Sequence, residues 1–214
     1  MDKKLRDMTV TEILELTASD APAPGGGSIS ALVAGLGSAL GQMVLALTFG
    51  KKAYEALDEG IQGQLQAENE ELARLRDRLL ELVDTDTEAF TAYMDALKMP
   101  KETEAEKAQR SQALADAAIF SMQVPLETAE RCLNVLKCLP MVARYGNKNA
   151  VTDAGVAALT ARAACEGALL NVKINLPSVK DEKIREKAAS HSEAVLKEAN
   201  ALCEEVMTIV YSKL

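Results

Sequence analysis

The sequence APAPGGGSISALVAGLGSALGQMVLALTFGKK occupies residues 21–52 and joins a glycine-rich loop to a long uncharged segment. No charged residue occurs between Ile29 and Phe49, which predicts a helix that is buried on all sides. Small residues recur there every fourth position and share a helix face, where a neighbouring backbone can come close. Because each glycine inside a helix costs about 1 kcal/mol relative to alanine, several together indicate close packing or the approach of a ligand. These residues are Ala31, Gly35 and Ala39 on one line, and Gly37 and Gly41 on another.

The loop before this helix is the first candidate for a binding site. Gly25, Gly26 and Gly27 let the chain turn sharply and bring backbone N–H groups near a ligand. Ser28 is placed to cap the helix, and the helix N-terminus favours an anion or a developing negative charge. The alternative is a plain turn before a core helix, because glycine-rich loops are weak signals by themselves.

The composition favours a single helical domain over residues 1–214. A chain of 214 residues forms one domain or at most two, and 48% hydrophobic with 26% charged residues indicates a packed core. Aromatic residues make up only 3%, which favours helices over strands. The net charge of −8 argues against binding nucleic acid through a broad basic surface, although a local cationic cluster can still bind a small anion.

The cysteines and the histidine do not form a metal-binding pattern. The four cysteines have neither C-x-x-C nor zinc spacing, and we expect buried, reduced thiols in a cytoplasmic protein. His191 is the single histidine, so one chain cannot build a zinc site from several histidines. We expect His191 to lie at the surface and no metal to be required. The cysteines are Cys132, Cys138, Cys165 and Cys203.

The uncharged segment is long enough to suggest a transmembrane helix. Its glycines and its polar residues Ser38, Gln42 and Thr48 disfavour this interpretation, and no other segment supplies a partner span. The charged N-terminus does not resemble a signal peptide. We therefore expect a buried helix and no membrane contact.

The remaining apolar residues recur at spacings of three and four, and no strand pattern of any length occurs. Helices are expected over about 9–18, 64–97 and 181–212, the first with a capping box from Thr9 and Glu12. A further helix follows residue 107; Pro125 should kink or break it, and Pro140 should end it. The sequence predicts an all-α bundle of six or seven helices, two of them buried and rich in small residues.

One carboxylate falls on the apolar stripe of the predicted helix 64–97. Continuing the stripe from Val83 to Phe90 places Asp86 on it, whereas Asp84 and Glu88 fall elsewhere and are expected to be solvated. A carboxylate on an apolar face is costly unless it is paired or functional. Asp86 is therefore the first candidate for a catalytic group, with a buried structural hydrogen bond as the alternative.

The segment RYGNKNAVTDAGVAALTARAACEGALLNVKIN, residues 144–175, repeats the design of the first one, with a Gly/Asn loop before an alanine-rich helix. If the two helices pack with both N-terminal loops at one end, Asn147, Lys148 and Asp153 converge with residues 25–28. Thr152 or Asp153 is expected to cap the second helix, which is compatible with a catalytic role for Asp153.

Six motifs in this order resemble the cyclodeaminase/cyclohydrolase family, which includes the C-terminal half of formiminotransferase-cyclodeaminase and stand-alone bacterial relatives. The resemblance extends from about residue 14 to 176, and the ordered set is specific although each motif alone is weak. Thr152 departs from the family, which often has Ser there. The formiminotransferase half is absent, so transfer activity is not expected. The motifs are PAPGGGS, GKKAY, DTDTEAF, VPLETA, GNKNAVTDAGVAA and GALLNVKIN.

The resemblance implies an all-α homodimer that acts on one-carbon folates with no other cofactor. Two reactions occur in the family. The cyclohydrolase opens methenyltetrahydrofolate with water to formyltetrahydrofolate, and the cyclodeaminase closes formiminotetrahydrofolate to methenyltetrahydrofolate and releases ammonia. We expect the cyclohydrolase reaction, because the other substrate needs a transferase that this chain lacks. A non-catalytic folate binder and a helical scaffold remain alternatives.

The candidate residues suit this chemistry. The methenyl bridge is a cation that a carboxylate stabilises, and a carboxylate can also act as general base or acid, with help typically worth about 10²–10⁴-fold. Asp86 is the first choice for this role and Asp153 the second. The other expected roles are pterin or water binding by Gly25–Ser28 and Asn147, and glutamate-tail binding by Lys51, Lys52 or Lys148.

Overall fold

The computed structural model describes residues 3–214, and this part of the chain contains helices and no strands. The predicted all-α bundle is therefore confirmed. The α-helices are α1 (Val10–Thr17), α2 (Gly26–Ala46), α3 (Lys52–Glu55), α4 (Glu59–Lys98), α5 (Glu104–Tyr145), α6 (Val151–Asn175) and α7 (Glu182–Tyr211). Short 3₁₀ helices are η1 (Leu5–Asp7), η2 (Lys148–Ala150) and η3 (Leu176–Ser178).

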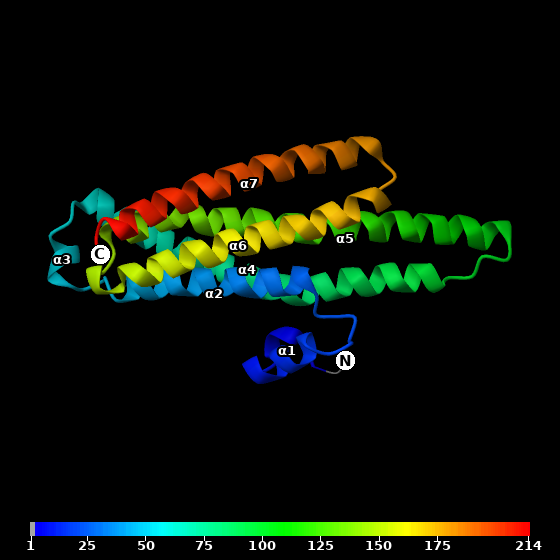
Figure 1. Ribbon diagram of the computed structural model, residues 1–214, viewed down its shortest axis with the longest axis horizontal. Coiled ribbons are helices and arrows are strands. Elements are labelled where there is room, and N and C mark those ends of the chain that lie inside the picture. Colours follow the sequence, from blue (N-terminus) through cyan, green and yellow to red (C-terminus); the bar gives the residue numbers. More distant parts are fainter. Residues whose placement is uncertain (1–2) are drawn as a thin grey trace.

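Five long helices run along the axis of an elongated bundle, and α1 projects from its side (Figure 1). Helix α2 packs against α4 and α6, while α5 packs against α4, α6 and α7. Helices α4 and α5 extend beyond the others at the end where they are joined (Figure 1). Helix α5 also touches α2, so it contacts all four of the other long helices, whereas α2 contacts three of them.

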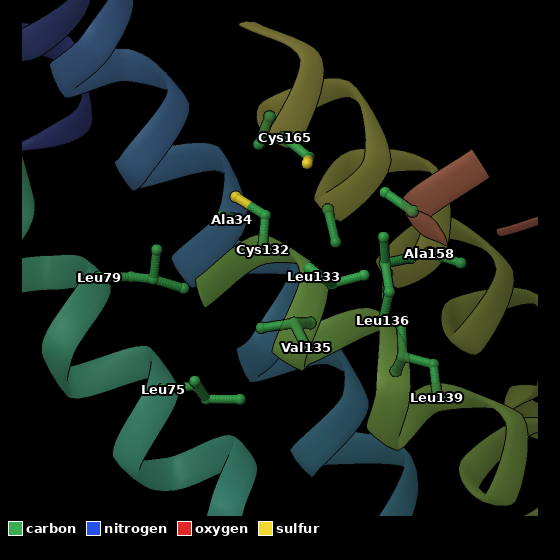
Figure 2. Packing of buried hydrophobic residues seen from close by; sticks show 14 of the residues in the cluster. Ala34, Leu75, Leu79, Cys132, Leu133, Val135, Leu136, Leu139, Ala158 and Cys165 are labelled. Carbon is green, nitrogen blue, oxygen red and sulfur yellow. The ribbon is translucent and has the colours of Figure 1, made fainter. Parts of the chain in front are cut away.

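The core combines large residues from two helices with small residues from two others. Leu75 and Leu79 of α4 and Leu136 of α5 are buried beside Ala34 of α2 and Ala158 of α6 (Figure 2). Each fully buried leucine contributes about 2 kcal/mol. The alanines let α2 and α6 come close enough for the leucines to fill the space between the helices.

Helices α2 and α6 are antiparallel, as shown by the residues that face their glycines. A Cβ added at Gly37 would meet Ala157 and Thr160, whereas one added at Gly26 would meet Asn171. The partner number rises as the α2 number falls. The N-termini of the two small-residue helices therefore lie at opposite ends of the bundle, and the predicted arrangement with both loops at one end is wrong.

Helix α5 continues through Pro125 and Pro140, so the helix does not break at Pro125 and the predicted end at Pro140 is wrong. Pro125 has no N–H to donate to the carbonyl of Ser121, four residues earlier. That carbonyl accepts a hydrogen bond from Asn175 Nδ2 of α6 at 2.7 Å instead. A side chain from another helix thus satisfies the group that the proline leaves unpaired.

The predictions that the four cysteines are free and buried and that His191 lies at the surface are confirmed. All four cysteines are free and buried, and burial raises the pKa of the Cys165 thiol to about 12. His191 lies on the exposed side of α7, with its Nε2 at 2.7 Å from Glu130 Oε1. Groups of three or more acidic, cysteine or histidine residues placed to hold a metal are absent from residues 3–214.

Candidate active site

Helix α2 begins at Gly26, with Gly25 as the N-cap, and its first turn is bound by a side chain from α4. Asp86 Oδ2 accepts hydrogen bonds from the backbone N–H of Ser28 at 2.7 Å and from Ser28 Oγ at 2.9 Å. The prediction that Ser28 caps this helix is therefore wrong. The carboxylate of Asp86 takes the place of a cap, because it satisfies an N–H that would otherwise have no partner.

Asp86 lies on the inner side of α4, as the apolar stripe predicts. Burial raises the pKa of Asp86, and the two hydrogen bonds from Ser28 lower it by less than burial raises it. A carboxylate whose pKa is raised by burial in a cavity is a candidate for general acid–base catalysis.

Gly27 is required by the position of this carboxylate. A Cβ added at Gly27 would overlap the Asp86 carboxyl group, and one added at Gly26 would come within 3.0 Å of Asn171 Nδ2. The loop glycines therefore let side chains from α4 and α6 approach the start of α2 directly, which is the close approach that glycine permits.

A cavity of about 370 Å³ opens beside Asp86. This volume is at the lower end of the range for small-molecule sites, which is about 300–1,000 Å³. Asp86 is the single charged side chain in its described lining, so the cavity suits a neutral or cationic group. The lining comprises Pro22, Ala23, Gly25, Gly26, Gly27, Asp86, Thr87, Ala89, Phe90, Tyr93, Met94, Ala118, Ser121, Asn171, Ile174, Asn175 and Ser178.

Two amides from the C-terminal end of α6 complete the polar part of the cavity. Asn171 Nδ2 donates to the carbonyl of Gly167 at 2.9 Å, and Asn175 Nδ2 donates to Ser121. Neither residue was predicted as a site residue, although their spacing of four places them on one helix face. Only the antiparallel packing of α2 and α6 shows that this face meets the glycine loop.

The other predicted site residues lie at the opposite end of α2. Asn147 donates through its backbone N–H to Thr48 Oγ1 at 2.8 Å and through Nδ2 to the carbonyl of Leu47 at 2.9 Å. Leu47 is 21 residues beyond Gly26, which is about 30 Å along a helix. Within one chain, the predicted convergence of Asn147 with the glycine loop is therefore wrong.

Four further candidates share the end of the bundle that holds Asn147. Lys148 and Asp153 follow Asn147 in η2 and α6, and Lys51 and Lys52 follow α2. None of them lines the cavity beside Asp86. The predicted cap of α6 is also wrong, because Ala150 is the N-cap residue and makes no side-chain hydrogen bond.

Asp84 is buried, although the sequence predicted a solvated side chain. It is 8% exposed, and its Oδ1 accepts a hydrogen bond from the backbone N–H of Leu5 at 2.8 Å. Arg6 Nε lies 3.4 Å from its Oδ2. The N-terminal segment covers this side of α4 and gives Asp84 a structural role, which the periodicity of α4 alone does not reveal.

Comparison with known proteins assigns the chain to a family. Residues 9–194 match the sequence model of the family described as Formiminotransferase-cyclodeaminase. The chain belongs to this family. It is 38% identical over 205 residues to Methenyltetrahydrofolate cyclohydrolase of Methylorubrum extorquens, and the match covers 96% of this chain and 97% of that protein.

Other family members are similar over most of this chain. Formimidoyltransferase-cyclodeaminase of Gallus gallus is 34% identical over 198 residues, which cover 92% of this chain but 36% of that longer protein. The crystal structure of formiminotetrahydrofolate cyclodeaminase from Thermotoga maritima superposes with a TM-score of 0.83 at 26% identity, over 96% of both chains. The helical bundle is thus the fold of the family.

Proposed function

We propose that this protein is a methenyltetrahydrofolate cyclohydrolase, which adds water to methenyltetrahydrofolate and forms formyltetrahydrofolate. The observation that carries the proposal is one partly buried carboxylate, Asp86, in a cavity whose described lining holds no other charge. A similar protein that matches along almost its whole length bears the name of this activity.

The charge of Asp86 suits the substrate. The methenyl carbon bridges N5 and N10 of the folate in an amidinium cation, and an ionised carboxylate in a cavity stabilises such a cation. The cation in turn favours the ionised form of Asp86, which counteracts the increase in pKa caused by burial. Substrate binding therefore prepares Asp86 to act as a base.

The reaction then takes place in two steps. Water attacks the bridging carbon while Asp86 accepts one of its protons, which gives a neutral carbinol. The bond between this carbon and N5 then breaks, Asp86 returns its proton to N5, and the hydroxyl proton leaves to solvent as the formyl C=O forms. One proton is released overall.

Formiminotetrahydrofolate cyclodeaminase is the second candidate, because the Thermotoga maritima protein of the same fold bears that name. In that reaction N10 attacks the formimino carbon, and Asp86 in its acid form protonates the departing ammonia. The same carboxylate serves both reactions, so the geometry of the site does not favour one over the other.

Competition between the two folates tests the proposal. Purified protein is given each folate in turn, while absorbance of the methenyl group and release of ammonia are both recorded. We expect the larger kcat/KM for methenyltetrahydrofolate. A tenfold larger value for formiminotetrahydrofolate, about 1.4 kcal/mol in transition-state stabilisation, would identify a cyclodeaminase. Binding without turnover of either folate would identify a non-catalytic binder.

We also propose that the protein works in the cytoplasm as a homodimer, without a metal or a second cofactor. The chemistry above needs only water and a carboxylate.

The dimer is supported by apolar side chains on α2 and α6 that the bundle leaves exposed, including Leu36 at 58% and Leu159 at 49%. Helix α2 is long and apolar enough to cross a membrane by length and composition alone. Within one chain, 44% of its most apolar 18-residue stretch is buried, so much of its apolar surface is left uncovered. A second copy would cover the remainder.

A further inference from the structure

Two polar side chains from different helices approach consecutive glycines at the start of α2. A Cβ added at Gly27 would overlap the carboxyl group of Asp86 from α4, and one added at Gly26 would lie 3.0 Å from Nδ2 and 3.6 Å from Oδ1 of Asn171 from α6. The Cα atoms of consecutive residues are about 3.8 Å apart. The carboxylate and the amide are therefore neighbours, and both line the cavity.

Hydrogen bonds determine which atom of each group is left for a ligand. Asn171 Nδ2 donates to the carbonyl of Gly167 at 2.9 Å, and because a carbonyl only accepts, the nitrogen of the amide must lie on that side. Both bonds from Ser28 go to Asp86 Oδ2. Within residues 3–214, Asn171 Oδ1 and Asp86 Oδ1 have no hydrogen-bond donor, so each remains an acceptor without a partner.

Water can reach both of these oxygens. The buried side-chain atoms of the described chain that lack a hydrogen-bond partner belong to Asp84, Arg110 and Arg131. The two free oxygens of the site are not among them, so they are open to the cavity that both residues line. Two neighbouring acceptors that are open to solvent suit a molecule with two protons to donate, which is a description of water.

We propose that Asn171 positions the water that attacks the methenyl carbon. This inference rests on the proposed function, in which Asp86 takes a proton from that water. When one O–H of the water points to Asp86 Oδ1 and the other to Asn171 Oδ1, both protons are held and a lone pair of the oxygen is free to face the carbon. Holding a nucleophile in its reactive orientation lowers the barrier.

A neutral amide is suited to this position. As the new C–O bond forms, the O–H bond directed at Asp86 breaks and its proton moves to that carboxylate. The other O–H bond stays intact and remains directed at Asn171 in the carbinol. A second carboxylate here would disfavour the ionised form of Asp86 by repulsion between like charges, whereas an amide accepts the hydrogen bond without a charge.

The sequence prediction gave the fixing of water to Asn147 and the glycine loop. Asn147 donates to the carbonyl of Leu47 at the opposite end of α2, so within one chain it does not reach a water held by Asp86. Asn171 supplies an amide at the position that the prediction required, from the opposite end of the same helix α6.

This role distinguishes the two reactions of the family. Hydrolysis brings in a free water molecule, which has to be held in place before it attacks. In cyclodeamination N10 attacks the formimino carbon of the same folate, so the nucleophile is already joined to the substrate. Loss of the Asn171 amide should therefore slow hydrolysis much more than cyclodeamination.

The test replaces Asn171 by Ala, a residue that favours the helix, and measures turnover of both folates. For methenyltetrahydrofolate we expect kcat to fall at least tenfold and KM to stay within twofold, because the amide contacts the water and not the folate. For formiminotetrahydrofolate kcat should stay within threefold. Formamide added to the assay supplies an amide group and should raise the kcat of Asn171→Ala at least threefold, with no effect on the wild type.

Asn200→Ala is the matched control. It removes an amide of α7 that accepts from Arg162 and lies outside the described lining of the cavity. Both rates should stay at the wild-type level and should not respond to formamide. An unchanged kcat for methenyltetrahydrofolate in Asn171→Ala, or an equal loss with both folates that formamide does not restore, would overturn the inference.

A high-resolution crystal structure separates this inference from the proposed function. The wild-type protein is expected to hold an ordered water within about 2.6–3.2 Å of both Asp86 Oδ1 and Asn171 Oδ1, and Asn171→Ala should lose it. Absence of this water from the wild type would overturn the inference. If methenyltetrahydrofolate is not turned over, the proposed function fails, and the crystal structures alone decide whether Asn171 and Asp86 hold a water between them.

Discussion

Asp86 contacts the N-terminus of α2 twice, through the backbone N–H and the hydroxyl of Ser28. These contacts explain how a carboxylate is held inside the bundle, and they would suffice for a purely structural role. The cavity beside it and the pKa raised by burial indicate a catalytic role as well. The two roles are compatible, because one carboxyl oxygen is bonded to Ser28 and the other remains for the substrate.

Replacing Asp86 by Asn separates these roles. The amide keeps an oxygen to accept from Ser28 but cannot act as a base, so turnover is expected to fall at least about a hundredfold.

The raised pKa of Asp86 means that the stability contributed by its protonated form is lost as the pH rises through the folded-state pKa. At pH 7 the variant should therefore unfold at the same or a higher temperature than the wild type.

Asp84→Ala is the matched control for that variant. It removes the acceptor for Leu5 N–H, so the free energy of unfolding should fall by about 1–3 kcal/mol, with kcat within twofold of wild type. Wild-type turnover by Asp86→Asn would show that Asp86 is structural and that the catalytic group lies elsewhere.

The pH dependence of kcat/KM tests the hydrogen bond from the Ser28 hydroxyl to Asp86. The rate should fall on the acid side as Asp86 becomes protonated, and the hydrogen bond from Ser28 Oγ lowers the pKa of Asp86. Ser28→Ala removes that bond, so the acid limb of kcat/KM should move to higher pH. Ser38→Ala removes a buried hydroxyl of α2 that bonds to Leu72 and should leave the limb in place. A limb that is unchanged in Ser28→Ala would contradict the role of Asp86 as base.

At the level of elements, a side chain of α6 forms a hydrogen bond with α5 at the position where α5 lacks one of its own helical hydrogen bonds. Pro125 leaves the carbonyl of Ser121 without its helical donor, and Asn175 supplies one. Both Ser121 and Asn175 also line the cavity. The proline therefore gives α6 a defined attachment point on α5 at the edge of the site.

A double-mutant cycle tests this compensation. Asn175→Ala should lower the free energy of unfolding by about 1–3 kcal/mol, because the Ser121 carbonyl loses its donor. In Pro125→Ala/Asn175→Ala the alanine N–H restores the helical bond, so the loss should be smaller. The measurement is chemical denaturation of all four proteins. Simple additivity of the two changes would show that the residues do not interact.

At the scale of the whole molecule, the outer surfaces of α2 and α6 form an apolar face. It borders the cavity, because Ile174 is 74% exposed and also lines that cavity. Covering this face by a second copy would shield the edge of the site from water. The exposed apolar residues of the face are Leu36, Met43, Leu47, Val156, Leu159, Leu170 and Ile174.

Charged residues on this face should dissociate the proposed dimer. In Leu36→Lys/Leu159→Lys, like charges would be buried at the contact, and the dissociation constant should rise at least tenfold. Sedimentation velocity across micromolar concentrations measures it. Leu80→Lys changes an exposed leucine of α4 outside this face and should leave the dimer intact. A wild-type protein that is monomeric at every concentration would refute the proposal.

The prediction that α2 is buried on all sides is wrong for a single chain, because Leu36 is 58% exposed. Local periodicity alone determined the helical class and the inward position of Asp86. These features depend on side-chain spacing within one helix, which the order of residues specifies directly. The direction of α6 relative to α2, the role of Asn175, the continuity of α5 through Pro125 and the burial of Asp84 were decided only by the tertiary structure. Each depends on which distant segment packs alongside, and contacts between distant segments leave no periodic pattern in the sequence. For the same reason Asn147 and Lys148, whose motif resembles that of the glycine loop, lie at the far end of the bundle.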